Sequence, residues 1–384
     1  MVLDPVAFTC ELIRCRSVTP ADGGAMDLVE RALTDLGFTC RRMRFGEIEN
    51  LYARLGSARP NLCFAGHTDV VPVGDLAAWS SAPFEAAVTD GVLVGRGAVD
   101  MKSAIAAFIA ATGRGLARGA PAGSISLLIT GDEEGVAEHG TKAVVAALAA
   151  EGEVIDHCVV GEPTSSAILG DMIKIGRRGS IGATITVEGR QGHVAYPDRA
   201  ANPVPVLVGL LARLQARRLD DGYEGFQPSN LEVTTIDVGN AATNVIPARA
   251  SAYVNIRFNP THTGEALAAW LIDEARVANE GFAGAVTLTP KISGEAFLTA
   301  PGDFTRVVAG AVRAVSGVEP QLSTTGGTSD ARFIRALCPV VEFGLVGATM
   351  HAVDERTPTA EIVALSAIYE RLMDDYFKAF GPTA

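Results

Sequence analysis

The seven residues Ser124-Ile125-Ser126-Leu127-Leu128-Ile129-Thr130 decide the fold class, together with the polar turn 131–134 that follows them. A run this short and this apolar is typical of a strand that is buried on both faces of a sheet. The flanking residues 101–116 and 141–150 have the apolar spacing of helices. A buried strand set between helices predicts an α/β sheet that is covered on both faces.

The same alternation of apolar strands and amphipathic helices continues outward from this stretch. The first helix has Asp4 in the N-cap position and Pro5 at its first helical position, which is a common helix start. We therefore expect a mostly parallel central sheet flanked by helices. The further strands are expected over 61–65, 156–160 and 340–343, and the further helices over 4–15, 25–36, 304–315 and 359–380.

The pattern of the chain changes near Gly179. Residues 180–188 alternate between apolar and polar, as in a half-exposed antiparallel strand. Two more strands are expected over 231–238 and 250–258, and two helices over 203–217 and 265–279. We therefore expect an inserted α+β domain, with two helices on an antiparallel sheet, over residues 179–291. Residues 1–178 and 292–384 would form the two parts of the α/β domain that it interrupts.

The composition excludes several functional classes. The 384 residues are 48% apolar and 20% charged, which is normal for a globular protein. Lys and Arg total 32 and Asp and Glu total 44, so the net charge is 32 − 44 = −12. This balance argues against a nucleic-acid binder or an anionic-membrane binder, although local arginines can still bind an acidic substrate. No segment is apolar for long enough to cross a bilayer, and no signal peptide is expected. The six cysteines form no C-x-x-C pair, so we expect a cytoplasmic protein.

Acidic and imidazole side chains follow several of the expected strands. The carboxyl ends of parallel strands meet at one edge of a sheet, so these side chains should lie together. Several carboxylates in one place need a counter-charge, and a divalent metal supplies it. Histidine and carboxylate ligands suit zinc or a metal of similar preference. The side chains are those of His67, Asp69, Asp100, Glu133, Glu134 and Glu162.

Taken singly, each of these residues also has a common structural role. It is their joint placement after successive strands that favours a metal site. The single roles are a hydrogen-bonded rim histidine for His67, a turn cap for Asp69, a helix N-cap for Asp100, solvated side chains for Glu133 and Glu134, and a turn for Glu162.

The remaining histidines divide into two groups. His351 follows the strand expected over 340–343 and could join the metal site, while His193 lies in the insertion between glycine and aromatic residues. His139 and His157 are expected at the surface. The loop 326–330 could bind an anion with its backbone N–H groups, or it could be a flexible turn that ends in a helix cap.

Four motifs give the chain its resemblance to the zinc-dependent aminoacylase/carboxypeptidase family. The resemblance extends over essentially the whole chain. Five further segments, 174–180, 191–197, 244–247, 326–330 and 341–344, resemble the family members that remove succinate from N-succinyl-LL-2,6-diaminopimelate. The four motifs are Phe64-Ala65-Gly66-His67-Thr68-Asp69-Val70-Val71-Pro72, Gly95-Arg96-Gly97-Ala98-Val99-Asp100-Met101-Lys102, Thr130-Gly131-Asp132-Glu133-Glu134-Gly135 and Val160-Gly161-Glu162-Pro163-Thr164.

The resemblance implies a site with two divalent metal ions, with zinc expected and cobalt or manganese able to substitute. His67 and Glu162 would bind one ion, Glu134 and His351 would bind the other, and Asp100 would bridge both. Asp69 would orient His67, and Glu133 would be the general base and acid.

The resemblance also implies a homodimer and a substrate. Residues 179–291 would form the dimerisation domain, and His193 would reach the partner's active site to stabilise the oxyanion. The substrate has three carboxylates, and arginine binds carboxylates in a bidentate manner. The expected substrate contacts are Arg178, Ser180, Tyr196, Asn244, Arg257, Gly327 and Thr328.

Two alternatives remain open from the sequence. The same metal chemistry could act on another substrate, as in an acetylornithine deacetylase, an aminoacylase or a metal carboxypeptidase. The chain could instead be a non-catalytic binding protein on the same fold. Such a protein usually lacks a ligand or the base, whereas Glu133 and all five expected ligands are present here.

Overall fold

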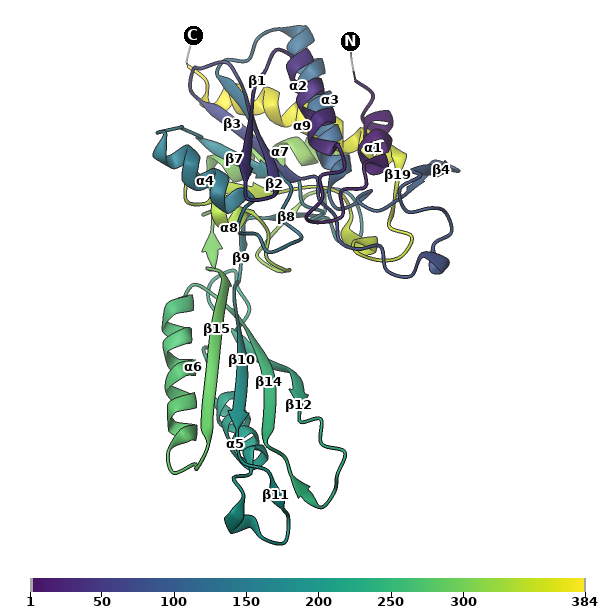
Figure 1. The fold of residues 1–384 in the computed structure, drawn as a ribbon. Coiled ribbons are helices and arrows are strands. Elements are labelled where there is room, and N and C mark those ends of the chain that lie inside the picture. Colours follow the sequence, from purple (N-terminus) through teal and green to yellow (C-terminus); the bar gives the residue numbers. More distant parts are fainter. Residues whose placement is uncertain (1–2, 383–384) are drawn as a thin grey trace. The chain divides into compact units, whose positions relative to one another are not determined.

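The largest sheet of the computed structural model, which describes residues 3–382, has eight strands in the order β1-β2-β6-β3-β7-β18-β8-β17 (Figure 1). Four of its pairings are parallel and three are antiparallel, so the sheet is mixed rather than mostly parallel. The strands are β1 Thr39–Phe45, β2 Ile48–Leu55, β3 Asn61–His67, β6 Ser124–Thr130, β7 His157–Val160, β8 Met172–Lys174, β17 Gln321–Ser323 and β18 Val340–Glu342.

Two of the three antiparallel pairings involve a hairpin that the apolar pattern does not predict. Strands β1 and β2 are joined by a two-residue turn, in which Gly46 has a φ of 57°. Strand β1 contains three arginines and is partly exposed, so it lacks the apolar signal of a buried strand. Strands β3 and β6, by contrast, are buried at every position, which confirms the interpretation of 124–130.

Helices cover this sheet, and their buried side chains form a hydrophobic core together with those of its strands. Phe64 of β3, Phe108 of α3 and Tyr369 of α9 pack together, with ring centroids 4.4 to 5.6 Å apart. The Tyr369 hydroxyl also donates a hydrogen bond of 2.6 Å to the Phe343 carbonyl. The helices are α1 Pro5–Arg14, α2 Ala25–Asp35, α3 Lys102–Arg118, α4 Thr141–Ala150, α7 Asp303–Ser316, α8 Ala331–Ile334 and α9 Thr359–Phe380.

A small three-stranded sheet adjoins the chain before α3. Its order is β19-β5-β4, with β4 Ala87–Thr89, β5 Val92–Val94 and β19 Arg356–Pro358. The Gly95 N–H donates to the Glu355 carbonyl, which extends the pairing of β5 with β19. The sheet therefore holds the segment after β5 beside the segment before β19.

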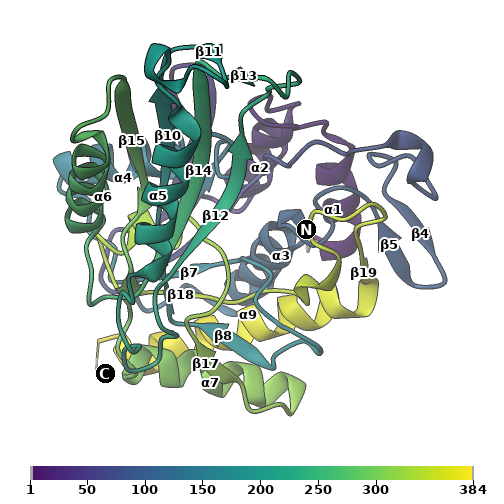
Figure 2. The same cartoon turned by 90° about the horizontal axis from the view of Figure 1, so that it is seen from below.

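The second large sheet is four-stranded and antiparallel, in the order β12-β14-β10-β15. Its strands are β10 Gly179–Glu188, β12 Asn230–Asp237, β14 Arg249–Phe258 and β15 Ala285–Gly294. Helices α5 Pro203–Ala216 and α6 Gly264–Asn279 pack on one face, and leucines of both helices share a core with β10 and β14 (Figure 2). Two short pairings complete this region: β11 Gly192–His193 with β13 Val245–Ile246, and β9 Gly176–Arg177 with β16 Phe297–Leu298.

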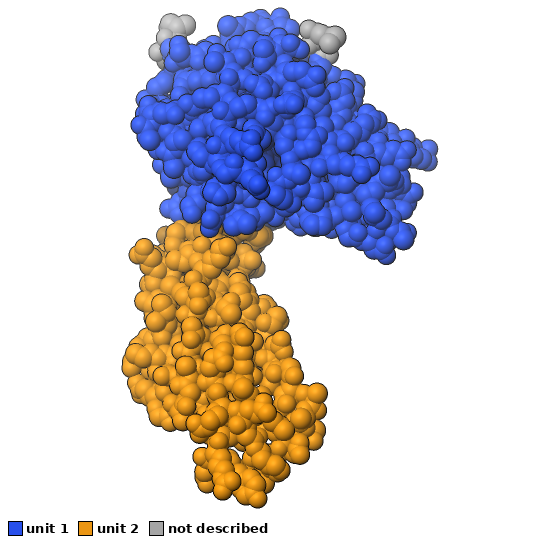
Figure 3. All heavy atoms as spheres, viewed as in Figure 1, with its two compact units in different colours: residues 1–175, 299–323, 329–384 blue, residues 176–298, 324–328 orange. Residues whose placement is uncertain are grey.

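The chain divides into two compact units (Figure 3). Unit 1 comprises Met1–Ile175, Thr299–Ser323 and Ser329–Ala384, and unit 2 comprises Gly176–Leu298 and Thr324–Thr328. The expected boundary at 291/292 falls inside strand β15, whose residues Lys291, Ile292 and Gly294 still pair with β10. Across residues 3–382, none of the helices is both long enough and apolar enough to cross a membrane.

Candidate metal centre

The carboxyl ends of neighbouring parallel strands converge in unit 1. Strands β6, β3, β7 and β18 are adjacent and parallel, so the segments after them meet at one edge of the sheet. His67 is the last residue of β3, and Glu162 follows β7 by two residues. The Glu133-Glu134 pair follows β6. The expected convergence of these side chains is therefore observed.

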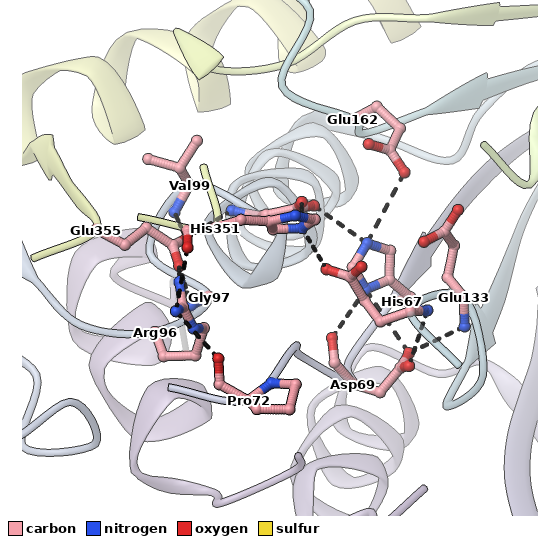
Figure 4. Close-up of polar contacts among 12 residues, drawn as sticks. His67, Asp69, Pro72, Arg96, Gly97, Val99, Glu133, Glu162, His351 and Glu355 are labelled. Carbon is pink, nitrogen blue, oxygen red and sulfur yellow. Dashed lines mark hydrogen bonds and ion pairs between the residues drawn. The ribbon is translucent and has the colours of Figure 1, made fainter. Parts of the chain in front are cut away.

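Two groups of metal-ligating side chains lie at this edge, and they share Asp100. In the first group, His67 Nε2 lies 3.2 Å from Asp100 Oδ1 and 3.8 Å from Glu162 Oε1 (Figure 4). In the second, His351 Nε2 lies 3.0 Å from Asp100 Oδ2 and 2.8 Å from Glu134 Oε1. Each group offers three ligand atoms within 4.8 Å of one another. The two oxygens of Asp100 thus face different imidazoles.

The local backbone explains why Asp100 and His351 are available for this role. Helix α3 begins at Lys102 with Met101 as its N-cap residue, so Asp100 does not cap the helix. Its side chain lies between the two imidazoles instead. His351 has a φ of 62°, in a left-handed region that costs a non-glycine residue about 1–2 kcal/mol. Such strain is typical of functional positions that the surrounding structure holds in place.

Asp69 connects the two glutamates to the imidazole of His67. Its carboxylate accepts hydrogen bonds from the backbone N–H groups of Glu133 (3.2 Å) and Glu134 (3.1 Å). The Nδ1 of His67 lies 2.9 Å from the main-chain carbonyl of Asp69 and 3.7 Å from its carboxylate. A proton on Nδ1 that bonds to this carbonyl leaves Nε2 as the atom that can bind a metal. Asp69 therefore orients His67 mainly through its backbone.

The ionisation of the site reflects a surplus of negative charge. Burial alone lowers the pKa of His67, but the hydrogen bond and charge of Asp100 outweigh it and raise that pKa well above its usual value. Hydrogen bonds to Asp100 and Glu134 raise the pKa of His351 to about 10. Burial, reinforced by the charge of Glu162, raises the pKa of Glu133 well above its usual range. Burial also raises the pKa of Asp69 to about 6.

The donor set fits two divalent cations. Each group combines one imidazole with two carboxylates, which is a ligand set that zinc and similar metals accept. The negative charge of the carboxylates favours protonation of both imidazoles. The same charge favours a bound metal ion, which displaces those protons when it binds. The residues present therefore fit a pair of ions bridged by Asp100.

Three of the expected substrate-binding residues meet at one end of the four-stranded sheet in unit 2. Ser180 of β10 pairs across the sheet with Arg257 of β14, and Arg257 pairs in turn with Asn230 of β12. Arg178 donates a hydrogen bond of 2.9 Å to the Asn230 side chain. Arg178, Ser180 and Arg257 therefore lie at the same end of the sheet, with Arg257 between Ser180 and Asn230.

The other expected residues of unit 2 form separate groups. His193 and Tyr196 are exposed, and their ring centroids lie 5.6 Å apart. The Val194 N–H donates to the Asn244 carbonyl, which brings Asn244 beside His193. Gly327 and Thr328 belong to the segment Thr324–Thr328, whose Thr325 carbonyl accepts a hydrogen bond from Arg177.

Three residues near the metal ligands were not identified from the sequence. Arg96 and Glu355 form a fully buried ion pair of 2.8 Å beside Asp100 and His351. Lys102 is fully buried, and its Nζ donates to the carbonyls of Leu12 and Cys15. Arg96 and Lys102 lie within the motif 95–102. Their long charged side chains among mostly apolar residues and glycines could have marked them as buried polar residues. Glu355 has no such signal.

Comparison with known proteins identifies a family and several full-length relatives. A sequence model of peptidase family M20/M25/M40 matches residues 63–375. The succinyl-diaminopimelate desuccinylase of Caulobacter vibrioides is 71% identical over 381 residues, covering 99% of this chain and 97% of that protein. The proteins of the same name from Phenylobacterium zucineum and Maricaulis maris are 71% and 59% identical, each over 98% of this chain and over 99% and 97% of their own lengths.

Solved structures share the fold at low sequence identity. The M20 family metallo-carboxypeptidase of Sulfolobus solfataricus superposes with a TM-score of 0.82 at 17% identity, over 98% of this chain and 99% of that one. A dinuclear metal-binding peptidase of the M20 family from Bacillus subtilis superposes with a TM-score of 0.68 at 16% identity, over 97% and 99% of the two chains. At these identities the likeness establishes the fold alone.

Proposed function

We propose that this chain, which belongs to peptidase family M20/M25/M40, is a metal-dependent amide hydrolase acting on N-succinyl-LL-2,6-diaminopimelate. Water cleaves the amide to give succinate and LL-2,6-diaminopimelate, in a step of lysine and diaminopimelate biosynthesis. The observation that carries the proposal is identity of up to 71% with named desuccinylases over nearly the whole chain. The two ligand groups that share Asp100 support the chemistry.

The proposed metal site uses the two groups described above. His67 and Glu162 would hold one ion, Glu134 and His351 would hold the other, and Asp100, which belongs to both groups, would contribute to each. Two bound divalent ions would polarise the amide carbonyl as Lewis acids and supply an activated water at neutral pH. The imidazole and carboxylate donors favour zinc, and cobalt or manganese can use the same ligands.

Glu133 is the proposed general base and acid. Its carboxylate accepts a proton from the attacking water and passes it to the departing amine nitrogen. Asp69 is the positioning residue, since it holds the backbone of Glu133 and the ring of His67.

Residues of unit 2 are proposed to bind the acidic substrate. Arg178 and Arg257 would bind its carboxylates, because the guanidinium group pairs with a carboxylate in a bidentate manner. Their grouping with Ser180 at one end of the sheet supports a shared anion site. The further proposed contacts are Tyr196, Asn244, Gly327 and Thr328.

The proposal includes a cytoplasmic homodimer. The subunits would associate through residues 179–291, and His193 would stabilise the oxyanion in the partner's site. The exposed position of His193 supports such a role. The six cysteines, all within the described residues, are free thiols, as is usual in a reducing compartment. Sedimentation as a monomer over a wide concentration range would contradict the dimer.

The substrate is tested by a panel assay on the zinc-loaded protein. N-succinyl-LL-2,6-diaminopimelate, N-acetylornithine and a dipeptide are compared, and release of the free amine is measured for each. Selective cleavage of the succinyl compound is expected. Cleavage of another panel member instead would leave the metal site in place and reject the proposed specificity. No cleavage of any member by a protein with two bound ions would reject the proposed activity on this substrate.

A further inference from the structure

A buried ion pair joins the two chain segments that carry Asp100 and His351. The Arg96 Nη1 and the Glu355 Oε2 are 2.8 Å apart, and the two side chains are 2% and 0% exposed (Figure 4). Arg96 follows strand β5, and Glu355 precedes strand β19, which pairs with β5. Neither residue is among the proposed metal ligands or substrate contacts.

The Glu355 carboxylate fixes the backbone that leads to Asp100. Its Oε2 accepts from the Gly97 N–H at 2.9 Å, in addition to Arg96. Its Oε1 accepts from the N–H groups of Val99 (2.7 Å) and Asp100 (3.0 Å). Three of the four residues from Gly97 to Asp100 therefore donate to one side chain. Because both oxygens are used, rotation of this carboxylate would break several of these bonds at once.

Arg96 also donates to three backbone carbonyls, two of which lie on the segment that carries His351. Its Nη1 donates to the Ala352 carbonyl at 3.1 Å, and its Nη2 donates to the His351 carbonyl at 3.4 Å and the Pro72 carbonyl at 3.3 Å. His351 is the ligand whose backbone lies in the left-handed region. Hydrogen bonds to its carbonyl and to the next one are the kind of restraint that keeps a strained residue in place.

The energetics of burial favour a positional role for the pair. Removing two charges from water costs several kcal/mol for each ion, and their attraction often only balances that cost. An apolar pair of the same volume would stabilise the fold equally well or better. What an apolar pair could not provide is the set of hydrogen bonds to the backbone of both ligand segments.

From these contacts we infer that Arg96 and Glu355 are positioning residues that set the spacing between Asp100 and His351. This inference rests on the proposed two-metal function. The ion held by Asp100, Glu134 and His351 has two ligands on the segments that the pair joins. The ion held by His67, Asp100 and Glu162 has one. Disruption of the pair should therefore weaken the first of these sites more than the second.

The test measures metal binding directly, without substrate. Metal-free full-length protein is titrated with Co²⁺, and the affinity of each site is followed by calorimetry and by the visible absorption of the bound cobalt. Glu355→Gln should weaken one of the two sites by about tenfold to a hundredfold, the usual effect of losing a group that orients a ligand. The cobalt absorption at saturation should change, because the ligand geometry at that site changes.

Two further variants separate positioning from stability. Arg96→Met combined with Glu355→Gln removes both charges, so no unpaired charge stays buried, and it should show the same loss of affinity. Glu370→Gln is the matched control, because Glu370 of α9 pairs with Arg114 and Arg118 of α3, and none of these three residues is a proposed ligand. It should bind both cobalt ions within about twofold of the unmodified protein, by the usual size of surface-pair effects.

Two outcomes would overturn the inference. A folded double variant that binds both ions with unchanged affinity and an unchanged cobalt spectrum would show that the pair does not position the ligands. A protein that binds fewer than two cobalt ions before any substitution would reject the two-metal function and the inference with it. The first outcome leaves the proposed function intact, so the two failures are distinguishable.

Discussion

At the scale of single residues, Glu133 offers the clearest separation of metal binding from catalysis. Glu133→Gln keeps the shape of the side chain but removes its ability to take a proton. Hydrolysis should fall by about 10² to 10⁴-fold, the usual contribution of a general base. Metal content should stay at the level of the unmodified protein. Steady-state kinetics and elemental analysis of the purified variant provide the two measurements.

A neighbouring glutamate gives the control for this substitution. Glu138 lies in the same loop and is exposed, and its backbone N–H contacts Asp132 rather than Asp69. Glu138→Gln should retain the full rate. Turnover by Glu133→Gln at close to the original rate would show that another group moves the proton.

The side chains of the two candidate metal-binding groups could be predicted to lie together, because each follows an apolar strand or lies in a motif of its own. Glu355 could not be predicted in this way. Its function depends on backbone N–H groups more than 250 positions earlier in the chain, and a backbone donor leaves no trace in the side-chain pattern. The prediction for His157 is wrong because its neighbours come from distant parts of the chain. It was expected at the surface, but it is half-buried and its ring packs against Phe304 and Phe380.

At the scale of elements, the packing of β3 against α3 and α9 should be a main source of stability for unit 1, which contains the candidate metal centre. Phe108→Ala should lower the free energy of unfolding by about 3–5 kcal/mol, because it removes a fully buried ring from a close-packed cluster. Val363→Ala on the exposed part of α9 should change it by about 0.5 kcal/mol or less. Urea unfolding compares the two variants, and similar losses would show that the aromatic cluster is not a main source of stability.

A second element, the loop before β12, should make unit 2 sensitive to acid. Although burial opposes it, hydrogen bonds from Ser229 and Gly222 lower the pKa of Asp220 from 3.8 to about 2. A carboxylate with a lowered pKa stabilises the fold fully above its unfolded value and loses that effect as the pH falls through its folded value. Asp220→Asn should therefore cost about 1–3 kcal/mol at neutral pH, and the difference should shrink between pH 3.8 and about 2.

Unfolding followed by the fluorescence of Trp270, which lies in α6 of unit 2, measures this difference. Asp273→Asn is the control, since the Asp273 side chain is exposed and forms an ion pair with Arg276 of the same helix, α6. It should have little effect at either pH. A difference for Asp220→Asn that stays constant down to about pH 2 would mean that its charge does not stabilise the loop.

The strands that could be predicted are those with an apolar or regularly alternating pattern, and the two helices α4 and α9 have the bounds expected of them. Strand β15 lacked such a signal. Its Pro290 and Lys291 break the apolar alternation, yet the strand pairs with β10 along nearly its whole length. A partner strand supplies its stability, and a single stretch of sequence does not contain that information.

At the scale of the whole molecule, removal of metal should affect the two units differently. All the proposed ligands lie in unit 1, and a ligand stabilises only the unit that binds it. The chain has two tryptophans, Trp79 in unit 1 and Trp270 in unit 2, so each unit has its own fluorophore. A chelator should lower the melting temperature reported by Trp79 by several degrees, since metal at about 100 times its Kd contributes about 2.7 kcal/mol.

The two signals are separated by measuring Trp270→Phe and Trp79→Phe in parallel. The transition reported by Trp270 should move by about one degree or less, because no proposed ligand lies in unit 2. A Trp79 transition that does not respond to the chelator would contradict the metal site.

The strand order of the central sheet has a consequence for synthesis on the ribosome. Strand β18 lies between β7 and β8, but it is made about 180 residues after β7 and about 165 residues after β8, when residues 176–298 have already emerged. The growing chain must therefore keep a place open in its largest sheet until residue 342 is available. His351 emerges later still, so the last of the proposed metal ligands becomes available only when the sheet can close. A chain released before this point would leave strand edges of its largest sheet unpaired, and such edges make an unfinished chain prone to aggregation.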